Sequence, residues 1–263
     1  MNDEQIPPRP DGLHPVPAPP APLGPEPAER PRATWSWWEG VAVYLLALVL
    51  GGVATVPVLG LLDDQDLANF VATALAAIVM VGVLLGWLST AHRSWRAVVG
   101  SPRPGRWGAE VRSGIGFGLL LYPGMVFGVG LVLNVILRAI SGEVVTVPEQ
   151  VPSDLSPAGV AVAILYAVVI APVHEELFFR GILFRGVRDR YGLVAGLLAS
   201  GLGFSLIHYI DGPWAGTLLL MGVMFFNGIA FAWFYDRRGN LVANVVAHGV
   251  FNVIGLTLIL TLG

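Results

Sequence analysis

The sequence between residues 157 and 180 reads PAGVAVAILYAVVIAPVHEELFFR. Its first part is apolar and uncharged, and it is long enough to cross a bilayer, which needs about 20 residues in a helix. Its end carries His174, Glu175 and Glu176, with Arg180 one turn further on. An ionisable side chain in a membrane helix costs roughly 2.5–3.5 kcal/mol on insertion scales, so such groups are functional candidates. We therefore expect a membrane helix that carries part of a functional site.

The rest of the chain repeats this apolar character. Of its 263 residues, 55% are apolar and only 13% are charged, whereas soluble proteins have about 25% charged residues. Together with a mean hydropathy of +0.70, this excludes an ordinary soluble protein. We predict an all-α fold, a polytopic membrane helical bundle of about seven transmembrane helices. The expected spans are residues 40–62, 67–88, 115–137, 157–179, 192–210, 214–235 and 241–262.

Composition divides the chain into three regions. Residues 1–34 hold 11 of the 20 prolines and have no periodic apolar face, so we expect a disordered Pro-rich cytoplasmic tail. We expect N-terminal transmembrane helices in residues 35–150 and a protease-like core in residues 151–263. Two pairs of glycines have the GxxxG spacing that favours close helix contact: Gly82 with Gly86, and Gly124 with Gly128. The chain has no cysteine, which excludes thiol nucleophiles, disulfides and cysteine-bound metals.

The positions of the arginines predict the topology. If the N-terminal tail lies in the cytoplasm, 14 of the 15 arginines face the cytoplasm, and Arg138 is the exception. Cytoplasmic loops are enriched in arginine and lysine, so this distribution favours a cytoplasmic N-terminus. Trp35, Trp37 and Trp38 precede the first span and are expected to form an interfacial aromatic belt. We therefore expect a multi-pass protein of the cell membrane.

Helical spacing assigns the polar side chains near residue 176 to different faces. Glu176 and Arg180 are four residues apart and can form an ion pair, whereas Glu175 is rotated by about 100° and can point elsewhere. The structural alternative is that both glutamates only reach the membrane interface. Pro172 has no N–H, so it is expected to leave the carbonyl of Val168 free and to bend or open the helix.

Further polar groups lie in two later spans. His208 stands near the end of the span 192–210, and His248 and Asn252 are four apart on the last span. One intramembrane histidine is more often a hydrogen-bonding contact between helices. Two histidines, an asparagine on the same face and the spare Glu175 together indicate a site. Two other asparagines are interpreted as hydrogen-bonding groups between helices: Asn227 and Asn244.

Two chemistries fit these residues. The run HEELF resembles the start of the HExxH zinc motif, but Phe178 stands where the second histidine is required. Zinc could still be bound by Glu175, His208 and His248 from three helices. The alternative needs no metal: a buried glutamate deprotonates water with help from one histidine, and the other histidine and Asn252 stabilise the oxyanion.

The depth of the two histidines sets a further condition. If the span 192–210 entered the membrane at residue 192, His208 would lie about 24 Å deep, whereas His248 would lie about 10 Å deep. Both must reach the same water. We therefore expect residues 181–195 to form an interfacial or protruding helical portion, which would place the site in the inner half of the membrane.

Three motifs occur in order on successive polar spans: Glu175-Glu176-x-x-x-Arg180, Phe204-x-x-x-His208 and His248-x-x-x-Asn252. Together they resemble the CPBP family of intramembrane proteases. That family includes the type II CAAX prenyl endopeptidases, the lysostaphin-resistance-protein-A-like proteins, and bacteriocin-processing or immunity proteins once grouped as Abi proteins. The resemblance covers about residues 155–260.

The resemblance implies a role for each motif residue. Glu175 would activate water with help from His208, His248 and Asn252 would form the oxyanion hole, and Glu176 and Arg180 would support the site. The family has been described both as glutamate proteases and as metalloproteases. We favour the glutamate mechanism, which requires no cofactor, because asparagine is a poor zinc ligand and a good hydrogen-bond donor.

The predicted function is therefore that of an intramembrane endopeptidase acting near the cytoplasmic leaflet. Its expected partners are the lipid bilayer and a peptide or membrane-protein substrate, with or without a lipid anchor, and no nucleic acid. One alternative is an ion- or proton-coupled transporter, because Glu, His and Arg in spans also mark ion paths; the sequence, however, has no visible inverted repeat. The other alternative is a non-catalytic bacteriocin-immunity membrane protein.

Overall fold

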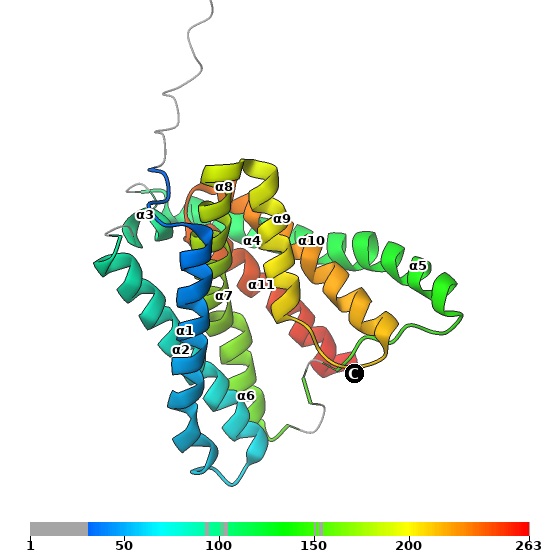
Figure 1. The fold of residues 1–263 in the computed structure, drawn as a ribbon. Coiled ribbons are helices and arrows are strands. Elements are labelled where there is room, and N and C mark those ends of the chain that lie inside the picture. The colour runs from blue at the N-terminus through cyan, green and yellow to red at the C-terminus, as the bar shows by residue number, and fades with distance from the viewer. Residues whose placement is uncertain are drawn as a thin grey trace, which may run out of the picture. The chain divides into compact units, whose positions relative to one another are not determined.

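The computed structural model describes residues 31–92, 95–100, 102, 105–149, 151–152 and 155–262. Most of the tail predicted for residues 1–34 therefore lies outside the described residues. Within the described ranges the regular structure is helical, without strands, and the predicted polytopic helical bundle is confirmed (Figure 1). The boundary between residues 35–150 and 151–263 stays a prediction, because contacts such as that of α4 with α11 join the two regions.

The first half of the chain contains α1 (Trp37–Leu59), α2 (Gln65–Thr90), the short α3 (Trp95–Val99), and one long helix made of α4 (Trp107–Pro123), the π-helical η1 (Gly124–Gly130) and α5 (Leu131–Ser141). The second half begins with another long helix, composed of α6 (Pro157–Leu165), η2 (Tyr166–Ile170), α7 (Ala171–Glu175), η3 (Glu176–Phe184) and α8 (Arg185–Tyr191). It continues with α9 (Leu193–Ile207), α10 (Trp214–Arg238) and α11 (Leu241–Leu262).

Six helices in the described residues are long and apolar enough to cross a membrane. The expected span 192–210 is instead α9, which has 15 residues and a length of about 22 Å, less than the roughly 30 Å of a hydrocarbon core. Large apolar side chains cover the outside of the bundle; Leu120 is 76% and Phe127 72% exposed. This exposed surface fits a multi-pass membrane protein, because lipid and not water is its suitable solvent.

A hydrogen-bonded link between two helix starts joins the first half of the chain to the second. Asp64 caps α2 by accepting the N–H of Leu67 at 2.9 Å. The same carboxylate accepts the hydroxyl of Ser156 at 2.6 Å, and Ser156 in turn caps α6 through the N–H of Gly159 at 3.1 Å. These caps satisfy backbone donors that a helix start leaves unpaired. They fix the start of the long helix Pro157–Tyr191 against the α1–α2 turn. We call it the motif helix, because it carries the motif of Glu175, Glu176 and Arg180.

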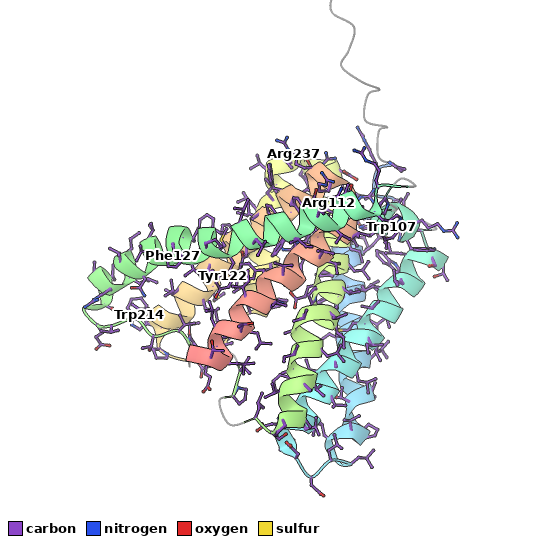
Figure 2. All side chains as sticks on the ribbon, turned by 180° about the vertical axis from the view of Figure 1, so that it is seen from behind. Trp107, Arg112, Tyr122, Phe127, Trp214 and Arg237 are labelled. Carbon is purple, nitrogen blue, oxygen red and sulfur yellow. The ribbon has the colours of Figure 1, made fainter. Side chains whose placement is uncertain are left out.

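The closest helix contacts do not involve the glycines that the sequence analysis selected. A methyl group added at any member of the two expected GxxxG pairs would meet nothing within 4 Å, so that expectation is wrong. The pair Gly114 and Gly118 on α4 makes the contact instead, because a Cβ there would lie 2.5 Å from the carbonyl oxygens of Ala243 and Ala247 on α11. Figure 2 shows this long helix crossing α11 on the far side of the molecule. GxxxG spacing alone could not tell a lipid-facing pair from a helix-facing pair.

Charged contacts gather at one end of the bundle. There Arg185 donates to the carbonyl of Ala97 at 2.8 Å, and Arg238 pairs with Glu110 at 2.8 Å. These contacts bring α3, α8, the end of α10 and the start of α4 together, and Figure 2 places Arg112 and Arg237 at this same end. We call this the arginine end. That this end faces the cytoplasm stays a prediction.

The tryptophans before α1 do not behave alike. Trp37 and Trp38 are 41% and 60% exposed, as an interfacial belt requires. Trp35 is fully buried, and its indole N–H donates to the carbonyl of Ile182 at 3.1 Å. The expectation was therefore wrong for Trp35, because this indole packs under the motif helix.

A tight turn at Gly192 connects α8 to α9. Its φ of +89° lies where only glycine is unstrained. Measured from this turn at 1.5 Å per residue, Glu175 lies about 26 Å and His208 about 24 Å along the chain. His248 lies only about 10 Å from the start of α11. The tip of the α8–α9 hairpin lies at one end of the bundle (Figure 1); that residues 181–195 are interfacial or protruding stays a prediction.

Candidate active site

Glu176, at the start of η3, is the centre of a buried polar cluster. Its side chain is fully buried, and its Oε1 lies 3.0 Å from Nη1 of Arg180 and 2.9 Å from Nδ1 of His248. Its Oε2 accepts the side-chain amide of Asn244 at 3.0 Å. The ion pair expected from the four-residue spacing is present. The carboxylate also joins the motif helix to α11.

Arg180 lies in a cage of aromatic rings. Its guanidinium carbon is 4.5 Å from the ring centre of Phe204, 5.1 Å from that of Phe231 and 5.8 Å from that of Phe179. The side chain is fully buried. Aromatic faces attract a cation that has lost its water, so the cage and Glu176 together stabilise a charge deep in the bundle. Arg180 is therefore no interfacial arginine.

His248 connects the two adjacent glutamates. Its Nδ1 faces Glu176, and its Nε2 lies 3.8 Å from Oε2 of Glu175. Glu175 is 8% exposed, and its Oε2 is buried without a hydrogen-bond partner. A separation of 3.8 Å is too long for a direct hydrogen bond but suits two groups that share one water molecule. The two glutamates thus have different surroundings, as their 100° separation predicted.

Asn252 is held by a carbonyl that Pro172 leaves without a partner. In η2 the N–H of Ala171 donates to the carbonyl of Tyr166, five residues earlier. The next bond of this π-helical pattern would join residue 172 to Ala167, but proline has no N–H. Instead, the side-chain amide of Asn252 donates to the carbonyl of Ala167 at 2.7 Å. The sequence analysis, which assumed α-helical register, named the carbonyl of Val168 and did not foresee the one of Ala167.

The carbonyl of Val168 has a different neighbour. A Cβ on Gly249 would lie 2.8 Å from this oxygen, so only glycine lets α11 approach η2 so closely. Gly249 lies between His248 and Asn252 in the sequence. The close approach therefore places both side chains beside the motif helix.

His208 follows the last turn of α9 and is half-buried. Its Nδ1 lies 2.8 Å from the carbonyl of Phe204. A carbonyl can only accept, so Nδ1 carries the proton and Nε2 keeps a free lone pair. The ring centre of Phe204 lies 4.5 Å from that of His208 and 5.8 Å from that of His248. The two histidines therefore lie on the same aromatic side chain.

Asn244 makes a hydrogen bond to the site in addition to the helix–helix contact expected from the sequence. It was interpreted as a hydrogen-bonding group between helices, and its amide indeed donates to the carbonyl of Phe231 on α10 at 2.8 Å. The same amide nitrogen also donates to Glu176. Its position one helical turn before His248 was the available signal, because residues four apart share a helix face. Asn244 thus belongs to the buried cluster.

The zinc alternative requires three ligands close together. In the part of the chain that the structure describes, no group of three His, Asp or Glu side chains is close enough to hold a metal ion. Glu175 and His248 approach each other, but Nδ1 of His248 already faces Glu176. The described side chains therefore do not fit a three-ligand zinc site.

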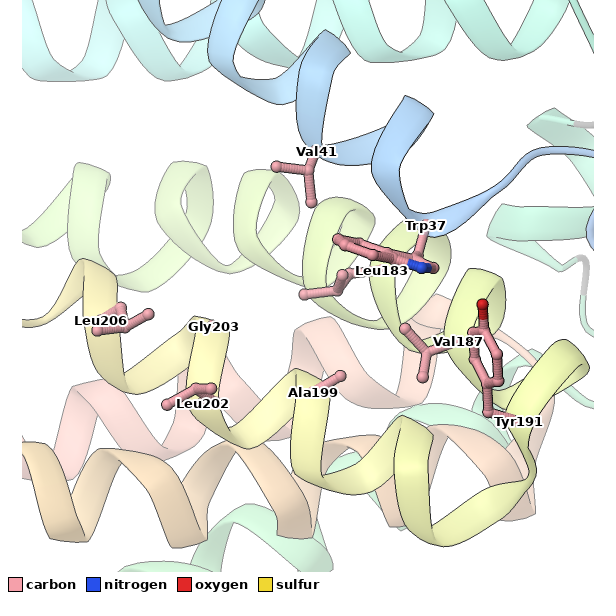
Figure 3. Close-up of a pocket in the computed structure, with 9 residues that line it drawn as sticks. All are labelled: Trp37, Val41, Leu183, Val187, Tyr191, Ala199, Leu202, Gly203 and Leu206. Atoms are coloured by element: carbon pink, nitrogen blue, oxygen red, sulfur yellow. The ribbon is translucent and has the colours of Figure 1, made fainter.

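An apolar groove of about 590 Å³ opens elsewhere, between α1, α9 and the end of the motif helix (Figure 3). It is lined by Trp37, Val41, Leu183, Val187, Tyr191, Ala199, Leu202, Gly203 and Leu206. None of the motif residues lines it, and its walls carry no carboxylate, imidazole or guanidinium. The groove is thus separate from the polar cluster.

Comparison with protein families finds one match in the second half of the chain. Residues 157–254 match the family of type II CAAX prenyl endopeptidases described as Rce1-like. Over this range the chain is similar to that family, and residues 157–254 are called the Rce1-like domain below. This assignment is consistent with the CPBP family that the motifs resemble, and it supports an intramembrane endopeptidase in general. The comparisons with curated proteins and with solved structures give no match. All three motifs lie inside the Rce1-like domain, and α1 to α5 lie outside it.

Proposed function

We propose that this protein is an intramembrane endopeptidase that hydrolyses peptide bonds with a water molecule activated by Glu175. The observation that carries the proposal is the position of His248 between the two glutamates, 2.9 Å from Glu176 and 3.8 Å from Glu175. Both oxygens of Glu176 have partners, and this carboxylate orients the imidazole of His248. Glu175 keeps its Oε2 free for water. This division of roles is what a general base and its support require.

The first step is proton removal from water. Glu175 takes the proton, and the resulting hydroxide attacks the carbonyl carbon of the scissile peptide bond. His208 assists as a second acceptor, because its Nδ1 is bound to a carbonyl and its Nε2 has a free lone pair. A buried carboxylate and a neutral imidazole are both suitable bases for this step.

The second step needs donors for the oxyanion. The Glu176 carboxylate accepts the proton on Nδ1 of His248, so Nε2 donates only after it receives a second proton. The proton that Glu175 took from water supplies it across the short gap between the two groups. Asn252 uses one amide hydrogen for Ala167 and keeps the other for the oxyanion. Collapse of the intermediate breaks the C–N bond, and the same proton passes to the leaving amine.

The proposed location is the inner half of the membrane. The arginine end of the bundle faces the cytoplasm in this proposal, because positively charged ends are retained there. Glu175 and His208 lie about 24–26 Å from the tip of the α8–α9 hairpin, so the hairpin projects toward the cytoplasm and the site remains within the bundle. Peptide bonds near the cytoplasmic leaflet would be reached first.

The test is peptide cleavage by purified protein in liposomes. Membrane-anchored peptides, with and without a C-terminal lipid, are incubated with the protein and with the Glu175→Gln variant, and products are identified by mass spectrometry. We expect cleavage by the wild-type protein alone. A protein that cleaves none of these peptides but moves protons or ions across the liposome membrane would be a transporter. A protein that does neither would fit the non-catalytic alternative.

A further inference from the structure

His174 directly precedes Glu175, the proposed base, and belongs to none of the three motifs. Its side chain is 7% exposed, and its Nε2 is buried without a hydrogen-bond partner. Buried polar atoms are nearly always paired, so an unpaired ring nitrogen indicates a partner that joins the protein from outside, such as water or substrate. The neighbouring Oε2 of Glu175 is unpaired in the same way. Two adjacent residues thus each present an unsatisfied atom.

A residue from outside the Rce1-like domain fixes the ring of His174. Tyr44 on α1 stacks on it, with ring centres 5.8 Å apart and planes inclined by 13°. Tyr44 also contacts Phe178, at 3.8 Å and 21°, and Phe179, at 6.2 Å and 57°. It therefore packs against three rings of the motif helix. The Tyr44 ring is itself buried, at 9% exposure, and packs along one face of the imidazole.

The same neighbourhood includes the proposed base. Tyr44, Tyr166 and His174 all interact electrostatically with Glu175. These three side chains come from α1, η2 and α7. Two of them, Tyr44 and His174, are in ring contact and form a second group beside Glu175. We call it the Tyr44–His174 wall.

We propose that His174 is a substrate-binding residue whose Nε2 hydrogen-bonds a backbone amide group of the substrate next to the scissile bond, with Tyr44 as its positioning residue. The inference rests on the proposed function and deepens it. An imidazole recognises a peptide N–H or C=O without regard to the side chain, so the wall would bind many sequences. Neutral imidazole has one donor and one acceptor nitrogen and suits either group.

This contact restricts the form of the substrate. Backbone groups in a transmembrane helix are already paired with one another. A backbone group can reach His174 only where the substrate is unwound. The substrate class is therefore an extended peptide segment, such as a juxtamembrane tail or a locally unwound span.

The experiment measures kcat and KM for the membrane peptide that the wild-type protein cleaves. His174→Phe keeps a ring for the stack with Tyr44 but removes both nitrogens, and His174→Leu is a second variant that does not depend on ring geometry. We expect kcat/KM to fall about tenfold in both, through a higher KM, because one hydrogen bond to substrate is lost. His174→Gln retains a side-chain amide and should recover most of the activity.

Tyr44 and a matched histidine complete the design. Tyr44→Phe preserves the stacking and should stay within threefold of wild type, whereas Tyr44→Leu should raise KM as His174→Phe does. His92→Phe, in the loop after α2, is the control for replacing a histidine by phenylalanine and should leave activity unchanged. Peptide affinity measured in a Glu175→Gln background should fall by the same factor when His174→Phe is added.

The outcomes separate this inference from the proposed function. Cleavage by the wild type with KM unchanged within twofold in His174→Phe and His174→Leu would overturn the role of His174 and leave the endopeptidase in place. Loss of activity in both variants with unchanged peptide affinity would also overturn it, since His174 would then not bind substrate. A wild-type protein that cleaves no peptide would overturn the proposed function itself.

Discussion

His248 lies 2.9 Å from Glu176 through its Nδ1, and this contact, together with that of Asn244, joins α11 to the start of η3 at the centre of the bundle. The contact determines which nitrogen of the imidazole faces Glu175. Because Glu176 also pairs with Arg180, its carboxylate cannot turn away without leaving a buried cation unpaired. In the proposed mechanism Glu176 is thus the structural anchor for the chemistry of Glu175.

Glu175→Gln and Glu176→Gln should therefore behave differently. Glu176→Gln leaves the buried Arg180 without its carboxylate, and breaking a buried ion pair costs about 3–5 kcal/mol. Glu175→Gln breaks no such pair, so its free energy of unfolding should stay within about 1 kcal/mol of wild type. Unfolding of each variant in detergent checks this. Equal destabilisation by both substitutions would contradict the assignment of Glu176 as the anchor.

Arg180→Lys should lower activity despite keeping the charge. The flat guanidinium contacts three aromatic rings as well as Glu176, and an ammonium group cannot reproduce this geometry. We expect kcat to fall about tenfold or more, because Glu176 and then His248 shift; a loss of 1.4 kcal/mol suffices. Arg112→Lys on α4 is the matched control and should keep full activity. Wild-type turnover of Arg180→Lys would show that only the charge matters.

Asn244 is expected to act through Glu176. Its amide donates to Oε2 of Glu176 at 3.0 Å, so Asn244→Asp would place a second carboxylate against the first. We expect Asn244→Asp to abolish turnover and Asn244→Ala to lower kcat about tenfold with KM unchanged, since substrate binding is untouched. Asn134→Ala on α5 is the control. A rise in KM alone would instead assign Asn244 to the substrate.

Pro172→Ala tests the origin of the Asn252 position. An alanine restores an N–H that can pair with the carbonyl of Ala167, which now accepts from Asn252. The amide of Asn252 would then lose its anchor, and we expect kcat to fall about tenfold, less than the roughly 10²–10³-fold loss of an oxyanion donor. The melting temperature in detergent should not decrease, because a helix bond is gained. Unchanged kcat would mean that Ala167 does not hold Asn252.

The motif spacing predicted much of this site. Four-residue spacing placed Glu176 beside Arg180 and rotated Glu175 away, and both features are present. The position of Asn244 one turn before His248 was a signal for the cluster, but its two hydrogen bonds depend on how α10 and α11 meet. The sequence also could not reveal the π-helical register of η2, which gives the carbonyl of Ala167 to Asn252.

The fold was predictable to a similar degree. Apolar length identified the membrane helices, but not that residues 193–207 form a helix too short to cross a bilayer. Trp35 looked interfacial from its position before the first span, yet it is buried under Ile182. Local spacing carries no information about which helix a side chain will meet. Contacts between distant segments could therefore be expected only where the chemistry of the motifs required them.

The central claim is that Glu175 activates the attacking water without a metal. The direct measurement is the single-turnover rate of peptide cleavage by purified, reconstituted protein after exhaustive chelation, for wild type and Glu175→Gln. We predict that wild-type cleavage survives chelation, and that Glu175→Gln cleaves roughly 10²–10⁴-fold more slowly, the usual contribution of a general base. Wild-type activity that is lost on chelation and restored by zinc, or a Glu175→Gln rate equal to wild type, would contradict the claim.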